Sequence, residues 1–387
     1  MKLKCLLLFL LFLYMNKSNA FDTTIVTQLL HRIEQLQVKE DGVFPKGVFP
    51  SYRTYALNKD RQKADINPFF TGLIVFTLNR IKDKLTPYQQ KLVEQISLNA
   101  NPSFAKFKNQ KGRNTYNFWP TDTPMIFPNA GWMNIFNKSQ SLPDDMDDTV
   151  MILMALNADK QTASNVHLLM QEYVNGGKGE INNTIPTNSN LPAYSVWFGQ
   201  KMPVDFDVSV LSNVLYFVQH NELPFTKADS ASIQVIVNIL KENKHITVAS
   251  FISPHYGSPE IILYHLSRLM SLKPIQDLEN FRLKLIEQTI ALQQKPQLFL
   301  NQVLLSSALF NWGISHRSLI IHNNKDLTEL IEDESFSFFI ANMASMLPTR
   351  LKKTLTATNL GKFKYYCPAY NNVLVLENII LHQKLVN

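Results

Sequence analysis

The sequence predicts an all-α protein, a single (α/α)6 toroid in which about twelve helices form an inner and an outer ring. Two observations predict it. Strongly apolar segments alternate with amphipathic ones along the chain, and a helix that is apolar on every side is normally buried between other helices. Signals for strands, meaning short alternating runs rich in β-branched residues, are weak throughout.

The apolar segments are expected to form the inner ring. Their starts carry helix-initiation signals, such as the dipeptide Asn67-Pro68, because Pro suits a first turn and Asn or Asp suits a cap. We expect these inner helices to begin at or near Asp65, Asp147, Asp207, Pro259, Leu298 and Ala369.

The amphipathic segments are expected to form the outer ring. In the first of them, Ile25, Leu29, Ile33 and Leu36 recur at helical spacing and would share one buried face. The remaining helices of this kind are expected at 86–99, 160–174, 227–240, 276–293 and 326–346.

Two long connections, 101–144 and 175–204, separate some of these helices and are rich in aromatic residues. An irregular α-solenoid is the alternative architecture, but it would need shorter and more uniform connections. Long ordered loops in compact domains are often functional. In a toroid, the loops that enter the inner helices would gather at one mouth.

Residues 1–20 resemble a secretory signal peptide. Lys2 and Lys4 form the charged start, an apolar run of Leu and Phe follows, and Ser18-Asn19-Ala20 supplies small residues for cleavage. A retained N-terminal anchor is the alternative. We expect one mature domain, 21–387, exported to the periplasm or secreted, with no membrane-spanning segment after cleavage.

Net charge and cysteine content restrict the possible partners and the cellular compartment of the protein. Removing Lys2, Lys4 and Lys17 lowers the formal net charge from +7 to about +4, which is too mild to indicate nucleic-acid binding. Cys367 is then the only cysteine, so the mature chain forms no internal disulfide. Among exported proteins, this favours the bacterial periplasm over the outside of a eukaryotic cell.

The most informative stretch is a group of four carboxylates, Asp144, Asp145, Asp147 and Asp148, directly before the apolar run 150–156. One or two would be ordinary caps for a helix N-terminus. Four exceed that need, and like charges this close raise one another's pKa. The group therefore predicts a proton donor or a cation site, with capping and solubility as the simpler reading.

A second stretch repeats this pattern. Asp205 and Asp207 precede Ser209 and an apolar run, as Asp145 and Asp147 precede Thr149, sixty residues earlier. In a toroid the two helix starts would be neighbours at the same mouth. We expect their carboxylates to converge in a cavity rimmed by aromatic side chains.

The motif 145–150, Asp-Met-Asp-Asp-Thr-Val, resembles the Asp-x-Asp-Asp-Thr-Ala signature of class II terpene cyclases, which include squalene–hopene cyclases and copalyl diphosphate synthases. The ending from Tyr365 to Glu377 resembles the last repeat of the prenyltransferase/squalene-cyclase superfamily. This resemblance implies that Asp147 is the general acid that protonates an alkene or epoxide, and that Asp145 and Asp148 tune and orient it.

The same resemblance implies aromatic faces that stabilise carbocations, for which Trp119, Trp132, Trp197 and Tyr256 are candidates. It implies no cofactor. Residues 144–148 also fit the Asp-Asp-x-x-Asp magnesium motif of class I prenyl enzymes, which keeps Mg²⁺ as an alternative. The chain has room for one toroid, whereas the cyclases usually carry two.

Three functions are compatible with these features. The first is an acid-catalysed isoprenoid cyclase or isomerase. The second is a periplasmic carbohydrate-active or carbohydrate-binding toroid, in which Asp147 with Asp205 or Asp207 would flank a glycosidic bond. Independently of the function, His255 is expected to hydrogen-bond an acidic partner across the mouth. The third is a non-catalytic scaffold. A deep apolar cavity would indicate an isoprenoid ligand, an open polar cleft a glycan, and a filled centre a scaffold.

Overall fold

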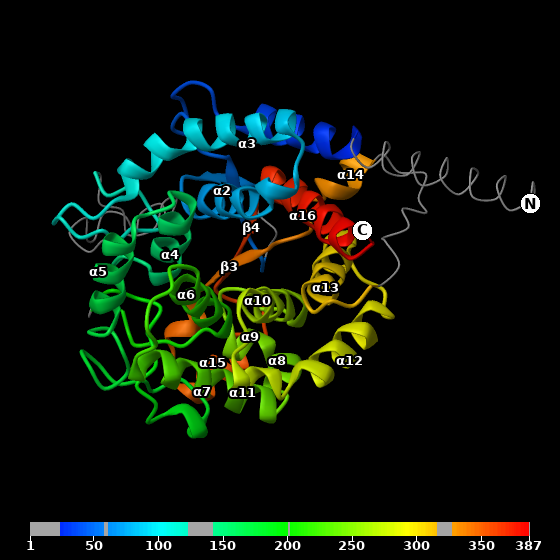
Figure 1. Cartoon of the computed structure of the whole chain (residues 1–387). Helices are drawn as coiled ribbons and strands as arrows, with labels where there is room; N and C mark the ends of the chain where they lie inside the picture. Colours follow the sequence, from blue (N-terminus) through cyan, green and yellow to red (C-terminus); the bar gives the residue numbers. More distant parts are fainter. Residues whose placement is uncertain (1–23, 58–60, 123–141, 200–201, 316–326, 387) are drawn as a thin grey trace, which may run out of the picture.

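The computed structural model describes residues 24–57, 61–122, 142–199, 202–315 and 327–386 (Figure 1). The fold is helix-rich, as predicted, and one continuous hydrophobic core extends from Val26 to Ile380. No helix in these ranges has the length and apolar character needed to cross a membrane. The expected signal peptide lies outside the described residues.

Six apolar helices form a closed ring. Each contacts the next one along the chain, and the last returns to contact the first, so segments from the two ends of the sequence meet (Figure 1). All six begin within a few residues of the predicted starts. They are α2 (Phe69–Ile81), α4 (Met146–Ala155), α6 (Val208–His220), α10 (Pro259–Leu272), α13 (Phe299–Asn311) and α16 (Pro368–Val386).

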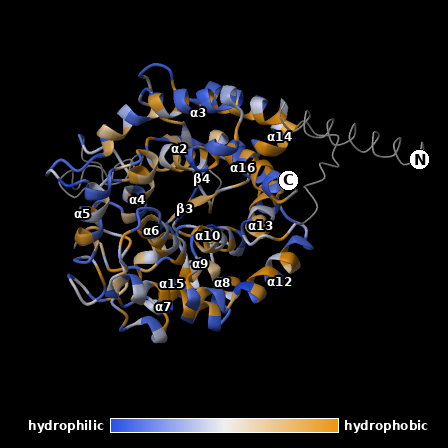
Figure 2. Ribbon diagram, viewed as in Figure 1, coloured by the Kyte–Doolittle hydropathy of each residue, from blue (hydrophilic) through white to orange (hydrophobic). Residues whose placement is uncertain are grey.

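The amphipathic helices lie outside this ring (Figure 1). Figure 2 shows hydrophilic and hydrophobic residues interleaved along them, and α3 buries Val93, Ile96 and Ala100 at helical spacing. The longer outer helices are 24–36, α3 (Pro87–Ala100), α5 (Lys160–Met170), α7 (Lys227–Lys241) and α12 (Arg282–Gln293). The short ones are α8 (Lys244–Thr247), α9 (Ala249–Ile252), α11 (Gln276–Glu279), α14 (Leu327–Ile331) and α15 (Thr349–Leu355).

The prediction of an all-α protein is wrong, because the fold also contains a four-stranded antiparallel sheet in the order β2-β1-β4-β3. Its register pairs Arg53 with both Lys63 and Tyr365, and Tyr365 with Phe339. The strands are β1 (Ser51–Tyr55), β2 (Lys63–Asp65), β3 (Phe339–Asn342) and β4 (Lys362–Tyr366).

Two of the predicted boundaries change with the sheet. Asp65 belongs to β2 and does not cap α2, whose N-cap is Pro68 without a side-chain cap. The expected helix at 326–346 is replaced by α14, β3 and a 3₁₀ turn, Met343–Met346. These strands have only three and four residues, and the sheet that holds them depends on the pairing of β1 with β4 from opposite ends of the chain, so local periodicity carries little signal for them.

The sheet lies at the end of the ring where the inner helices begin. Strand β2 ends just before α2, and β4 ends just before α16. The ring of Phe339, in β3, packs on that of Phe69 at the start of α2, with centroids 4.8 Å apart. The sheet therefore covers part of the mouth at which the acidic loops enter.

Side chains of opposite helices meet inside the helical ring, below the mouth. The guanidinium of Arg268 is buried, with its carbon 5.3 Å from the ring centroids of both Phe76 and Tyr264. Phe76 belongs to α2 and Arg268 to α10, so this contact crosses the ring. Open space is found instead at the mouth, where the candidate site lies.

Candidate functional site

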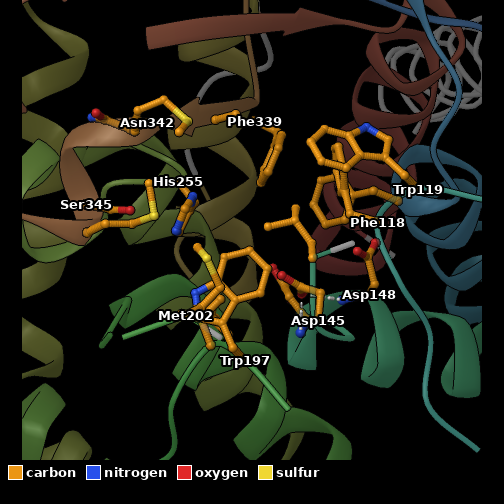
Figure 3. Close-up of a pocket in the computed structure, with 18 residues that line it drawn as sticks. Phe118, Trp119, Asp145, Asp148, Trp197, Met202, His255, Phe339, Asn342 and Ser345 are labelled. Carbon is orange, nitrogen blue, oxygen red and sulfur yellow. Dashed lines mark hydrogen bonds between the residues drawn. The ribbon is translucent and has the colours of Figure 1, made fainter. Parts of the chain in front are cut away.

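A pocket lies between the starts of α2, α4 and α6 and the segment 339–346 (Figure 3). It contains about 670 Å³ of space free of protein atoms, part of it open to solvent. Five aromatic rings form much of its wall, namely Phe69, Phe118, Trp119, Trp197 and Phe339. Leu142, Val196, Met202, Val210, Ala341, Met343 and Met346 add apolar surface; the polar lining residues are Asp145, Asp147, Asp148, His255, Asn342 and Ser345.

Asp145 is the N-cap of α4. Its Oδ1 accepts the backbone N–H groups of Asp147 at 2.7 Å and Asp148 at 3.0 Å, as expected for a cap. Its own N–H donates to the carbonyl of Tyr116 at 2.9 Å, which holds the long connection against the helix start. Burial, together with the neighbouring charge of Asp147, raises the pKa of the Asp145 carboxyl to about 8.

Asp147 is held by donors on two neighbouring elements. Asn213, on α6, donates from Nδ2 to Oδ1 at 2.7 Å, and the Tyr256 hydroxyl donates to Oδ2. Arg268 donates in turn to the Asn213 amide oxygen, so a buried cation stands behind this carboxylate. Burial raises the pKa of Asp147 to about 6, and the bonds from Tyr256 and Asn213 limit the rise.

Asp148 differs from both. Its side chain is 1% exposed and lines the pocket, and neither carboxyl oxygen has a hydrogen-bond partner within the described chain (Figure 3). Burial, followed by the charges of Asp145, Asp147 and Asp144, raises its pKa well above the ordinary value. An isolated carboxyl in such surroundings is far cheaper to bury when it is neutral.

Asp207 is the N-cap of α6 and corresponds to Asp145 in α4. Its Oδ1 accepts from the Ser209 N–H at 2.9 Å and from the Ser253 hydroxyl at 2.6 Å. Its Oδ2 accepts from the His255 backbone N–H at 3.0 Å. The sequence repeat aligned Asp145 with Asp205. The structure corrects this alignment, because Asp145 lies directly before α4 and Asp207 lies directly before α6, so these two caps correspond.

Asp205 pairs with a buried lysine that the sequence did not single out. The Lys352 ammonium donates to Oδ1 at 2.5 Å, and the His255 Nε2 lies 4.0 Å from Oδ2. The His255 ring lines the pocket and stacks nearly parallel on Phe339, at 12°. His255 therefore has an acidic neighbour, as predicted, but at a distance longer than a hydrogen bond.

The structure brings most of the predicted residues together. Asp145, Asp147, Asp148, Trp119, Trp197 and His255 line one pocket. Tyr256 is fully buried beneath it and bonds Asp147, whereas Asp205 and Asp207 do not line it. Trp132 lies outside the described residues.

Several contributing residues were not predicted. Arg268 could have been singled out from the sequence, because a charged residue within a strongly apolar helix requires a buried partner. Asn213, a polar residue within another apolar helix, gives a weaker indication of the same kind. Phe339 and Lys352 carry none, because their placement depends on β3 and α15 reaching the mouth from a remote part of the sequence.

The possibility of a bound metal is not strengthened by the geometry. Within the part of the chain that the structure describes, no three His, Cys, Asp or Glu side chains are grouped as metal ligands. The Mg²⁺ alternative therefore rests on the sequence motif.

Comparisons with known protein families, curated proteins and solved structures found no match to this chain.

Proposed function

We propose that this protein is an acid-catalysed isoprenoid cyclase or isomerase. One observation carries the proposal: three buried carboxyl groups face a pocket whose wall is otherwise largely apolar and aromatic. Protonation of an alkene needs a carboxyl that keeps its proton, and burial beside like charges provides this. The resulting carbocation needs stabilising faces, which the aromatic rings supply.

We further propose that the architecture is an (α/α)6 toroid with an added sheet. The cyclic contacts of the six apolar helices, and the amphipathic helices outside them, support this reading. The resemblance of residues 145–150 to the class II terpene cyclase motif is consistent with it. In such a toroid the acidic motif lies at an inner helix start, and the position of residues 145–148 at the start of α4 supports the proposal.

The glycan alternative receives less support from the geometry. It needs two carboxyl groups on either side of a bond. Asp205 is engaged by Lys352 and Asp207 caps α6, and neither lines the pocket with Asp147. An apolar pocket also offers few hydrogen-bond partners to sugar hydroxyls.

The function is tested by incubating the purified protein with a linear polyprenyl alkene, its terminal epoxide and a polyprenyl diphosphate, each with and without Mg²⁺. We expect a product of unchanged mass with fewer double bonds or a shifted one. When D₂O replaces water, protonation of an alkene should leave one carbon-bound deuterium per molecule, whereas protonation of the epoxide puts the deuterium on an exchangeable oxygen. A glycan-cleavage assay runs in parallel. Cleaved glycan, or no product from any isoprenoid, would contradict the proposal.

Export to the periplasm or the medium is also proposed, on the strength of residues 1–20. Mass spectrometry of the protein from its native cell should find a mature chain that begins at Phe21. Recovery of the intact N-terminus from the cytoplasm would show the opposite.

A further inference from the structure

The three carboxyl groups of the pocket differ in one respect that bears on their roles. Asp145 accepts two backbone N–H groups, and Asp147 accepts from Asn213 and Tyr256. Asp148 accepts from no donor within the described residues, although it is as deeply buried as the other two. Hydrogen bonds of this kind stabilise the ionised form of a carboxyl, and the described residues provide them to Asp145 and Asp147 but not to Asp148.

We propose that Asp148 delivers the proton in the reaction and that Asp147 acts as a fixed carboxylate facing the cation that forms. This assignment rests on the proposed function. It differs from what the motif resemblance implies, which places the proton donor at Asp147.

The surroundings of Asp148 favour its neutral form. The groups that face it are Asp144, Asp145 and Asp147 from its own segment and Tyr365 from β4, all acidic. A negative charge at Asp148 would be repelled by these carboxylates, and none of the described residues donates a hydrogen bond to it. The group is thus held with its proton while it lines a pocket that admits a ligand.

The surroundings of Asp147 favour the opposite form. Two donors fix its oxygens, and the buried Arg268 supports one of these donors through the Asn213 amide oxygen. A carboxylate fixed in this way needs no rearrangement when a positive charge develops nearby. It complements the aromatic faces of Phe69 and Trp119 in the same pocket.

The step balances without any further reactant. The π electrons of the alkene take the proton of the Asp148 carboxyl, so its O–H bond breaks and a C–H bond forms. The cation is left on the more substituted carbon, and a second double bond of the substrate can attack it. Solvent water takes a proton from a neighbouring carbon, whose C–H electrons form the new double bond, and the same solvent returns a proton to the Asp148 carboxylate.

The first test needs no substrate. Infrared difference spectra at neutral pH compare the wild-type protein with Asp148→Asn and Asp147→Asn. A protonated carboxyl that makes no hydrogen bond absorbs at the highest carbonyl frequency. We expect this component to disappear in Asp148→Asn and to persist in Asp147→Asn. Asp144→Asn is the matched control, since Asp144 belongs to the same motif but does not line the pocket.

Asp148→Asn should fold, because the wild-type side chain makes no hydrogen bond to the part of the chain that the structure describes. Circular dichroism checks this. A component that persists in Asp148→Asn, or that disappears in Asp147→Asn instead, would overturn the assignment whether or not the protein is a cyclase.

The second test uses the substrate that the functional assay identifies. Asp148→Asn should reduce turnover by roughly 10²–10⁴-fold, the usual contribution of a general acid. Asp147→Asn should lose less of its turnover, and its product should still contain one deuterium from D₂O. Full turnover in Asp148→Asn would overturn the assignment and leave the cyclase function standing. An inactive wild-type protein with the expected infrared result would instead refute the cyclase function.

Discussion

At the scale of single residues, the buried aspartates make the stability of this protein depend on pH. An ordinary aspartate has a pKa of about 3.9. The pKa is about 8 for Asp145 and about 6 for Asp147, and burial raises the pKa of Asp148 well above its usual range. The folded protein therefore binds these protons more tightly than the unfolded chain does.

The sign of the effect follows from this difference. The stabilisation is complete below the pKa of the unfolded chain, near pH 4, and it is lost as the pH rises through the folded pKa of each group. The free energy of unfolding should then fall by about 1.4 kcal/mol per pH unit for each such group within its window. A site that keeps carboxyls protonated thus lowers stability at neutral and alkaline pH.

Replacing Asp148 should make this visible. Asp148→Asn removes one of these groups, so the free energy of unfolding should fall less steeply between pH 5 and pH 8, by up to about 1.4 kcal/mol per pH unit. The variant should be more stable than the wild type at pH 8. Urea unfolding at a series of pH values measures this.

Asp159→Asn is the control. Asp159 is an exposed cap of α5 whose pKa is lowered by the Thr162 backbone N–H, so it titrates below this window. The free energy of unfolding of Asp159→Asn should change with pH in the same way as that of the wild type from pH 5 to pH 8. Parallel curves for Asp148→Asn as well would mean that Asp148 is ionised in the folded protein.

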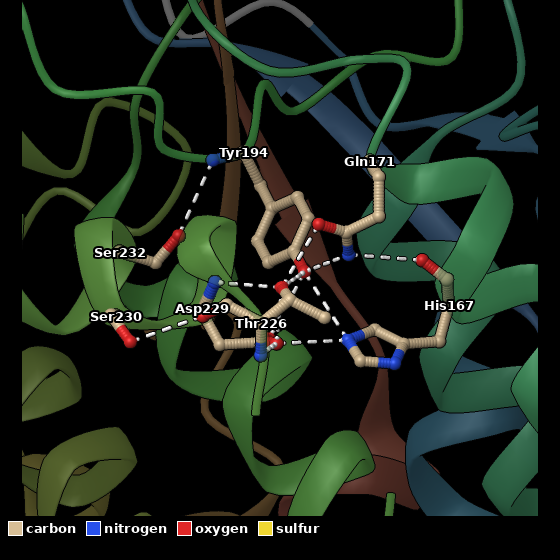
Figure 4. Close-up of polar contacts among 7 residues, drawn as sticks. All are labelled: His167, Gln171, Tyr194, Thr226, Asp229, Ser230 and Ser232. Atoms are coloured by element: carbon tan, nitrogen blue, oxygen red, sulfur yellow. Dashed lines mark hydrogen bonds and ion pairs between the residues drawn. The ribbon is translucent and has the colours of Figure 1, made fainter. Parts of the chain in front are cut away.

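At the scale of elements, one polar cluster fixes the loop that carries Trp197 (Figure 4). The Tyr194 hydroxyl donates to Asp229, on α7, at 3.0 Å and accepts from Gln171, at the end of α5, at 2.5 Å. His167 contacts the same carboxylate at 3.0 Å. Because Trp197 follows Tyr194 by three residues, this cluster positions one wall of the pocket.

Removing the Tyr194 hydroxyl should loosen that wall. Tyr194→Phe removes the donor to Oδ1 of the buried Asp229 and one bond of the half-buried Gln171, so we expect a loss of about 1–3 kcal/mol in the free energy of unfolding. Hydrogen exchange should accelerate in residues 193–198. Tyr173→Phe is the matched control, because its hydroxyl accepts a single, partly exposed bond from Arg113. Equal effects in the two variants would argue against a positioning role for the cluster.

The same scale shows how far the sequence predicts the fold. Helices α4 and α6 were predicted because their signals are local: an acidic cap, a hydroxyl residue and an apolar run lie within a few positions. Strand β3 was not predicted, because its four residues gain their hydrogen bonds from β4. Three of its four residues are half-buried, so β3 also shows no alternation of buried and exposed positions.

The candidate site follows the same division. Asp145, Asp147 and Asp148 lie together in the sequence, so their role near a helix start was predictable from charge alone. Asp147 differs from Asp148 because it accepts hydrogen bonds from Asn213 and Tyr256, which lie far along the chain. Which carboxyl keeps its proton is therefore a property of the assembled mouth.

At the scale of the whole molecule, the ring is closed by a buried ion pair between its first and last helices. Arg80, near the end of α2, donates to Glu377 of α16. Glu377 is fully buried and also accepts from the Tyr264 hydroxyl of α10 at 2.7 Å. One carboxylate thus joins three inner helices, two of which come from opposite ends of the sequence.

Neutralising Glu377 should weaken this closure. Glu377→Gln leaves the Arg80 guanidinium largely buried without a countercharge, and breaking a buried pair in this way typically costs roughly 3–5 kcal/mol. The matched control is Glu332→Gln, which breaks a pair with Arg32 that also joins the two ends of the chain but is partly exposed. That loss should be about 1 kcal/mol or less. Urea unfolding followed by tryptophan fluorescence and by circular dichroism should show one transition at a lower midpoint for Glu377→Gln, because the ring unfolds as a unit once α16 separates from α2. A loss no larger than that of Glu332→Gln would mean that apolar packing between these helices, and not the ion pair, holds the ring closed.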